Sequence, residues 1–119
     1  MKLDTLIKRV EKFNQELAEC YKQTECVELY CVDTTIVGDT MYIAPFTITE
    51  EISEGERLVT FVQEDGEEYH ITQEMLDEEF EIQVDSLLGD MRYYRRMIKK
   101  TWRVWQSENP DAELEKEDE

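Results

Sequence analysis

The apolar residues between positions 2 and 22 recur at alternating spacings of three and four. The series is Leu3, Leu6, Val10, Phe13, Leu17 and Cys20. This spacing predicts an amphipathic helix, because residues three and four apart share one helix face. The same series would serve as a coiled-coil seam, but about three heptads is near the minimum length for one. We therefore expect the stripe to pack on the chain's own domain.

Residues 26 to 48 contain two runs rich in β-branched and aromatic residues, which favour strands. We expect strands near 26–37 and 40–48, joined at Gly38-Asp39, a pair suited to a two-residue hairpin turn. Pro45 cannot donate a backbone hydrogen bond to a neighbouring strand. The second run should therefore lie at a sheet edge or break there.

A second hairpin is expected after an acidic loop over 49–56, with strands at 58–63 and 68–72. Its turn is Asp65-Gly66. A two-residue turn there would place Val62 opposite Tyr69, and Phe61 opposite His70.

The chain after residue 72 is expected to be mainly helical. The hydroxyl of Thr72 is well placed to cap a short helix over 73–80. Residues 79–85 alternate between polar and apolar, so either helix or a short fifth strand fits them. A long helix from Ser86 to Gln106 follows. Its apolar stripe is Leu87, Met91, Tyr94, Ile98, Trp102 and Trp105.

Together these elements predict an α+β fold, in which an antiparallel four-stranded sheet of two hairpins packs with the N-terminal and C-terminal amphipathic helices. One domain should span 1–107, because a chain of 119 residues suits a single core. The acidic segment 108–119 has little apolar surface and is expected to be a disordered tail. The expected core is Leu3, Leu6, Val10, Phe13, Leu17, Leu29, Cys31, Val59, Phe61, Ile71, Leu87, Met91, Ile98 and Trp102.

Charge changes this picture, because the formal net charge is −17 and it is unevenly distributed. Residues 23–91 carry nineteen acids against the single base Arg57. A surface this negative repels nucleic acid and anionic membranes and speeds encounter with a basic partner. We expect that partner to be a protein, with direct nucleic-acid binding disfavoured and no membrane contact.

Carboxylates are concentrated on the second hairpin and on the short helix that follows it. If that helix continues, Glu74, Asp77, Glu78 and Glu81 form one stripe along it. Carboxylates spaced along a rigid surface can take the place of phosphates in the basic groove of a nuclease. The candidate partner-binding residues are Glu64, Asp65, Glu67, Glu68, Glu74, Asp77, Glu78 and Glu81.

The long helix carries six bases at spacings of three, one, three, one and three. They are Arg92, Arg95, Arg96, Lys99, Lys100 and Arg103. These spacings place them on one side, opposite the apolar stripe. Three interpretations remain open: a solvated outer face complemented by carboxylates elsewhere in the chain, a docking face for an acidic surface such as that of a second copy, and a nucleic-acid or membrane contact.

The sequence offers little for catalysis. His70 is the single histidine, and the motifs of nucleophilic hydrolases, P-loop enzymes, zinc proteases and calcium loops are all missing. Cys20, Cys26 and Cys31 are odd in number and lack zinc-ligand spacing, so they are interpreted as core residues in a reducing compartment. We expect no catalytic residue, no metal and no cofactor. No run is apolar enough for a signal peptide or membrane span, so we expect a cytoplasmic protein.

The stretch "EDGEEYHITQEMLDEEFE", residues 64–81, resembles a stretch found in many small phage and prophage proteins of unknown function. It combines an Asp-Gly hairpin, a nearby aromatic residue and a short capped helix ending in Phe-Glu. The resemblance implies a mobile-element setting, with the host cytoplasm as the compartment. Small acidic phage proteins include inhibitors of host restriction or CRISPR nucleases, whose charge layout is similar.

These observations favour a non-enzymatic acidic protein that binds a basic partner through its carboxylates, such as an inhibitor or nucleic-acid mimic acting on a nuclease or another nucleic-acid-binding protein. Two alternatives stay open. One is a structural or assembly component that forms a homo-oligomer through its heptad-patterned helices. The other is an immunity protein that neutralises a basic toxin.

Overall fold

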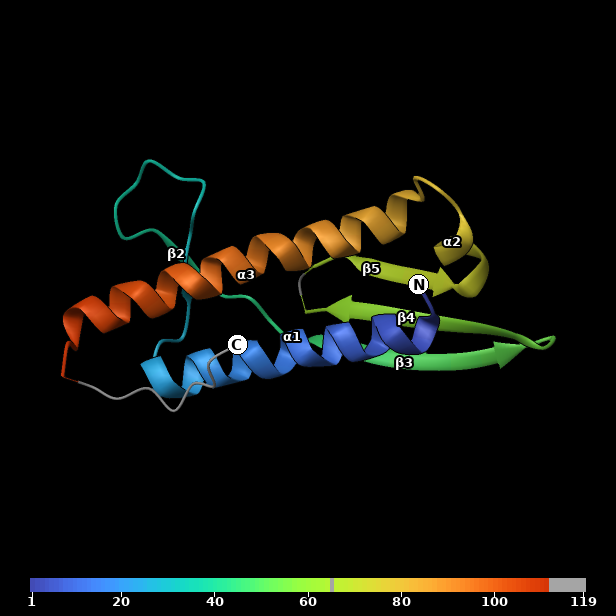
Figure 1. Cartoon of the computed structure of the whole chain (residues 1–119), viewed down its shortest axis with the longest axis horizontal. Helices are drawn as coiled ribbons and strands as arrows, with labels where there is room; N and C mark the ends of the chain where they lie inside the picture. Colours follow the sequence, from blue (N-terminus) through green and yellow to red (C-terminus); the bar gives the residue numbers. More distant parts are fainter. Residues whose placement is uncertain (65, 112–119) are drawn as a thin grey trace.

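Two long helices and a three-stranded sheet make up most of the molecule (Figure 1). The computed structural model describes residues 1–64 and 66–111. The elements are α1 (Leu3–Thr24), β1 (Leu29–Tyr30), β2 (Thr40–Met41), β3 (Phe46–Ser53), β4 (Glu56–Gln63), β5 (Glu68–Thr72), α2 (Gln73–Asp77) and α3 (Ile82–Glu108). The molecule is elongated, measuring 56 × 31 × 24 Å.

The N-terminal helix is confirmed, with its apolar stripe buried throughout. The stripe packs against α3 and the sheet within the chain's own core, as expected, and is not left open as a coiled-coil seam. α1 ends at Thr24, and the capping residue Glu25 has a φ of 56°, the left-handed conformation typical of a helix C-terminus. None of the helices in the described ranges is long and apolar enough to cross a membrane.

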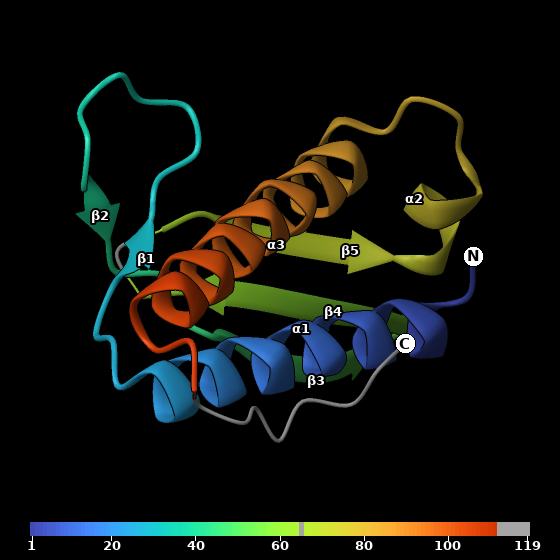
Figure 2. The same ribbon diagram turned by 60° about the vertical axis from the view of Figure 1, so that its left-hand side comes forward.

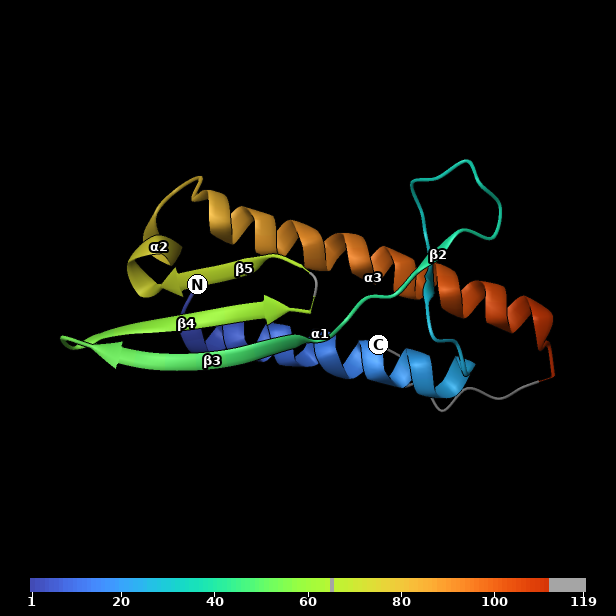
Figure 3. The same cartoon turned by 180° about the vertical axis from the view of Figure 1, so that it is seen from behind.

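The three-stranded sheet is antiparallel, with the order β3-β4-β5. The two long helices pack on one face of this sheet (Figure 2), the face that carries Val59, Phe61 and Ile71, where the core lies. On the opposite face Thr49 and His70 are exposed, and the view from behind shows these strands in front of α1 (Figure 3). Every residue of the expected core is buried, and the core also includes Met97, which the apolar stripe of the last helix did not predict.

The expected four-stranded sheet is wrong, because β1 and β2 form a separate two-stranded sheet with only two residues each. Residues 31–39 are a loop, closed by a bond of 2.9 Å from the Cys31 N–H to the Asp39 carbonyl. The β-branched residues here lack a surface on which to pack, since Ile36 and Val37 are 67% and 99% exposed. Gly38 does adopt a positive φ, but within a longer loop than predicted. The strand break expected near Pro45 is confirmed.

The acidic loop expected over 49–56 is also wrong, since β3 and the turn to β4 occupy these residues. An edge strand with one solvent-facing side needs few apolar residues, so glutamates are tolerated. Ser53 pairs with Glu56 across the two-residue turn Glu54-Gly55. Both turn residues have positive φ, 53° and 78°, which identifies a type I′ hairpin turn.

The hairpin of β4 and β5 is confirmed, but its register differs by one residue from the prediction. Phe61 pairs with Tyr69, and Thr60 pairs with His70. The loop is one residue longer than a two-residue turn, because it is closed by the Gln63 N–H and the Glu67 carbonyl at 3.4 Å. The longer loop places Phe61 and Tyr69 together on the core face.

The C-terminal elements are largely as expected, with different boundaries. Thr72 caps α2 by accepting the Met75 N–H at 3.3 Å, but α2 ends at Asp77. The ambiguous segment 79–85 is loop up to Glu81, whose carboxylate caps α3 by accepting the Gln83 N–H at 2.6 Å. α3 then continues to Glu108. Residues 112–119, most of the expected tail, lie outside the described residues.

Candidate functional site: a groove between the sheet and the long helix

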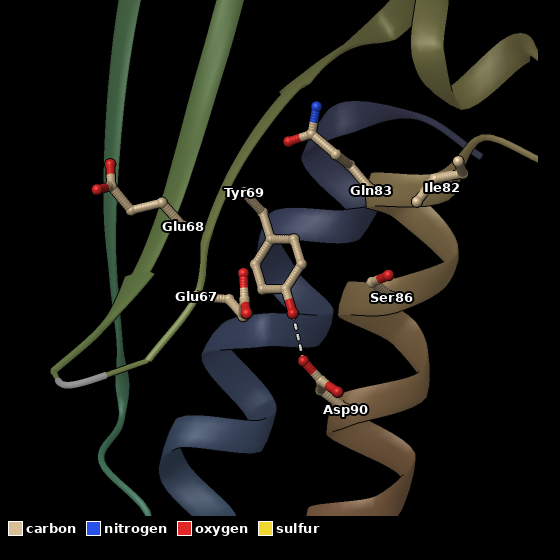
Figure 4. A pocket seen from close by; sticks show the side chains of 7 residues that line it. All are labelled: Glu67, Glu68, Tyr69, Ile82, Gln83, Ser86 and Asp90. Carbon is tan, nitrogen blue, oxygen red and sulfur yellow. Dashed lines mark hydrogen bonds between the residues drawn. The ribbon is translucent and has the colours of Figure 1, made fainter.

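A groove of about 410 Å³ lies between β5 and the N-terminal part of α3 (Figure 4). Three of its lining residues belong to the β5 side and four to α3. They are Glu67, Glu68 and Tyr69 on one side, and Ile82, Gln83, Ser86 and Asp90 on the other.

Helical spacing explains how α3 forms its wall, because Gln83, Ser86 and Asp90 follow one another at intervals of three and four. Gln83 also holds the two walls together. Its side-chain oxygen accepts the His70 N–H at 3.0 Å, which joins the edge of β5 to α3. This bond holds the two walls of the groove, β5 and α3, in place relative to each other.

Within the groove, the Tyr69 hydroxyl donates a hydrogen bond to an Asp90 carboxylate oxygen, which joins β5 to α3. Tyr69 is only 3% exposed. Its burial, and then its hydrogen bond to Asp90, raise the pKa of the phenol well above its ordinary value. At neutral pH the phenol therefore stays protonated and donates, and the carboxylate accepts.

Carboxylates and apolar groups surround this bond. In Figure 4 the Glu67 side chain lies near Tyr69, whereas Glu68 points away from it and forms the outer rim. Ile82, at the other end of the groove, is 78% exposed. Phe80 lies two residues before it, is 81% exposed and has a φ of 63°, a strained conformation for an aromatic residue. Such a surface can hold a cationic side chain and the apolar carbons beside it.

The structure separates the predicted acidic residues into two groups. Glu64, Glu67 and Glu68 lie where β5 begins, and the other group lies where β5 ends. That second group is Glu74, Asp77, Glu78 and Glu81. Asp65 lies outside the described residues. The continuous stripe over 74–81 depended on a longer helix and does not form, because α2 ends at Asp77 and Glu81 caps α3.

Sequence reasoning found Glu67 and Glu68 but missed the rest of the groove. The missed residues are Tyr69, Ile82, Gln83, Ser86 and Asp90. The sequence pattern predicts that the long helix begins at Ser86. This boundary leaves Ile82 and Gln83 outside the helix and does not place them on the same face as Ser86 and Asp90. The signal was present, since Gln83, Ser86 and Asp90 have helical spacing on a side that carries no base.

Three of the six bases of α3 have partners elsewhere in the chain. Arg95 pairs with Glu16 at 3.2 Å and Arg96 with Asp33 at 3.7 Å. Lys100 donates to the Cys31 carbonyl at 2.6 Å, which fixes the 31–39 loop on α3. The other three bases, Arg92, Lys99 and Arg103, are exposed.

His70 lies on the open face of the sheet, where its Nδ1 is 3.1 Å from the Thr60 hydroxyl and its Nε2 is 3.5 Å from a Glu68 carboxylate oxygen. Within the described residues, no group of three or more histidine, cysteine or acidic side chains is placed to hold a metal ion. The three cysteines are free thiols, and Cys20 and Cys31 are buried.

Comparisons with protein-family models, with curated proteins and with solved structures each gave no match for this chain.

Proposed function

We propose that this protein is a non-enzymatic binding protein that holds a basic segment of a protein partner in the groove between β5 and α3. The observation that carries this proposal is the convergence of Glu67 and Asp90, from two elements, on one groove beside the exposed side chain of Ile82. The net charge of −17 would speed the encounter with such a partner.

The chemistry of the groove suits a lysine or arginine. Asp90 and Glu67 supply acceptor oxygens for the cationic group, and the rim residue Glu68 extends the negative potential outward. Phe80 and Ile82 offer apolar surface to the rest of the partner's segment. Exposed aromatic and apolar anchors beside charged groups are typical of protein interfaces.

A nuclease or another nucleic-acid-binding protein is the class of partner we favour. Such proteins present basic grooves that evolved for phosphates, and carboxylates of this protein would compete for them. The resemblance of residues 64–81 to a stretch in small phage proteins supports an inhibitor acting in a host cytoplasm.

The experiment uses two variants with the same change in charge. Glu67→Lys/Glu68→Lys alters the groove, whereas Glu74→Lys/Glu78→Lys alters the other acidic group at the far end of β5. The partner is first captured from host lysate on the wild-type protein and purified. Its affinity for all three proteins is then measured by titration at two salt concentrations.

We expect the groove variant to lose about tenfold or more in affinity and the control variant less than about threefold. Affinity for the wild type should fall as salt rises, because exposed charges are screened. Equal losses in both variants would mean that net charge alone attracts the partner. No loss in either variant would exclude the groove.

A further inference from the structure

The second half of β3 presents an open strand edge. β3 is eight residues long and lies at one side of the sheet. In an antiparallel sheet, alternate residues direct their backbone N–H and C=O groups to opposite sides of the strand. One set therefore pairs with β4, and the other points outward.

Two contacts show which set points outward. The Gln63 N–H bonds across the β4–β5 hairpin, so the neighbouring Val62 faces β3 and pairs there with Thr47. Asn14 agrees with this assignment, because its side chain accepts the Phe46 N–H at 2.8 Å and donates to the Phe46 carbonyl at 2.9 Å. The outward set on β3 is therefore Phe46, Ile48, Glu50 and Ile52.

The chain caps its sheet edges with amide side chains in two places. Asn14 occupies the outward groups of Phe46, and Gln83 occupies the outward N–H of His70 on β5. Among the described residues, no hydrogen bond reaches the outward backbone groups of Ile48, Glu50 or Ile52. On the side of β3 away from β4, Figure 3 shows no helix or strand along the second half of the strand, toward the hairpin tip. Ile52 is 73% exposed.

The charge of this hairpin selects what can pair with the edge. Glu50, Glu51, Glu54 and Glu56 lie on it, and Arg57, the one base between residues 23 and 91, is already held by Asp4 at 2.7 Å and by Glu50. A second copy would bring glutamates close to glutamates, which opposes pairing. A segment bearing lysine or arginine would be attracted.

We propose that the free edge of β3 between Ile48 and Ile52 accepts an extended basic segment of a protein partner as a fourth strand. Backbone hydrogen bonds would supply the affinity, and the glutamates would select basic side chains. This edge is distinct from the groove between β5 and α3, and the inference does not depend on the function proposed for that groove.

The probe is a synthetic peptide of alternating lysine and valine with blocked ends and the same length as β3. The control peptide has the same sequence and charge but carries an N-methyl group on every residue, so neither of its edges can donate a backbone hydrogen bond. Backbone amide exchange is followed by NMR in the full-length protein. With the first peptide, exchange at Ile48, Glu50 and Ile52 should slow by about tenfold, and the control peptide should have little effect.

Two variants separate the backbone from the side chain. Ile52→Pro removes an outward N–H while leaving the bonds to β4, so it should lower peptide affinity by about tenfold. Ile52→Thr keeps the N–H and should retain affinity within about threefold. Protection of Thr49 and Glu51 in each variant shows that β3 is intact.

Three results would overturn the proposal. Equal binding of the N-methylated and the unmodified peptide would show attraction by charge alone. Protection of amides away from β3, with none on its outward set, would show that the peptide binds elsewhere. A dimer detected by light scattering and dissociated by Ile52→Pro would show that the occupant of the edge is a second copy. If Ile52→Pro fails to fold, the comparison of the two peptides decides the question.

Discussion

Tyr21, Tyr69 and Thr101 each use a hydroxyl group to join separate parts of the chain. The Tyr21 hydroxyl donates to the Ile43 carbonyl at 2.9 Å and accepts the Ile43 N–H at 3.0 Å. Thr101, fully buried, accepts the Tyr30 N–H at 2.9 Å and donates to Met97 in its own helix. Buried and half-buried polar groups that are satisfied in this way favour one arrangement of the elements, because another arrangement would leave them without partners.

The buried phenol of Tyr69 predicts a characteristic loss of stability at alkaline pH. Its folded-state pKa is raised, so its contribution is present below the ordinary tyrosine pKa of about 10 and is lost as pH rises above that value. Tyr69→Phe should be less stable than the wild type by about 1–2 kcal/mol at neutral pH, because it loses the bond to Asp90. The difference should shrink above about pH 10.

Urea unfolding of both proteins at a series of pH values measures this effect. The phenolate absorbance of the folded wild type, recorded at the same pH values, serves as the control for ionisation. Curves for the two proteins that stay parallel throughout the alkaline range would contradict the assignment.

At the scale of elements, helices were predictable and strands were only partly so. The apolar stripe from Leu3 to Cys20 predicts a helix without ambiguity, because spacings of three and four do not fit a strand. The glutamates of β3 made its sequence resemble a loop. An edge strand with one solvent-facing side does not need an alternating apolar pattern, so the strand could not be predicted from periodicity. Ile36 and Val37 suggested a strand that does not form, because they have no surface on which to pack. Predicting the groove would have required both the start of α3 and the register of the β4–β5 hairpin. Local sequence patterns determine neither of them.

The turn between β3 and β4 offers a direct test of hairpin chemistry. Glu54 adopts the left-handed conformation, which asparagine tolerates better than glutamate. Glu54→Asn should therefore raise the free energy of unfolding by about 0.5–1 kcal/mol. The matched control is Glu56→Asn, which removes the same charge from the neighbouring strand position. Equal stabilisation by both substitutions would show that relief of charge repulsion, not backbone conformation, is responsible.

At the scale of the whole molecule, the dominant property is an excess of like charge on an elongated body. Carboxylates lie at both ends of β5, and several of the α3 bases already have partners within the chain. The folded state therefore contains net repulsion, which salt should screen.

Thermal unfolding should shift upward by about 1–3 °C when sodium chloride is raised from about 0.01 M to about 0.15 M. A variant with Glu74→Gln and Glu78→Gln should respond less, because it has fewer charges to screen. A melting temperature that falls with salt would mean that ion pairs such as Asp4–Arg57 outweigh the repulsion.

The pairing of α1 with α3 brings together the two ends of the sequence, as the contact between Glu16 and Arg95, 79 positions apart, shows. During synthesis, α1 leaves the ribosome long before the helix that covers it. At about 5–20 residues per second the interval lasts several seconds, during which the apolar stripe of α1 is uncovered. A nascent chain in that interval has the features that chaperones bind, and its core closes only when the last quarter of the protein has been made.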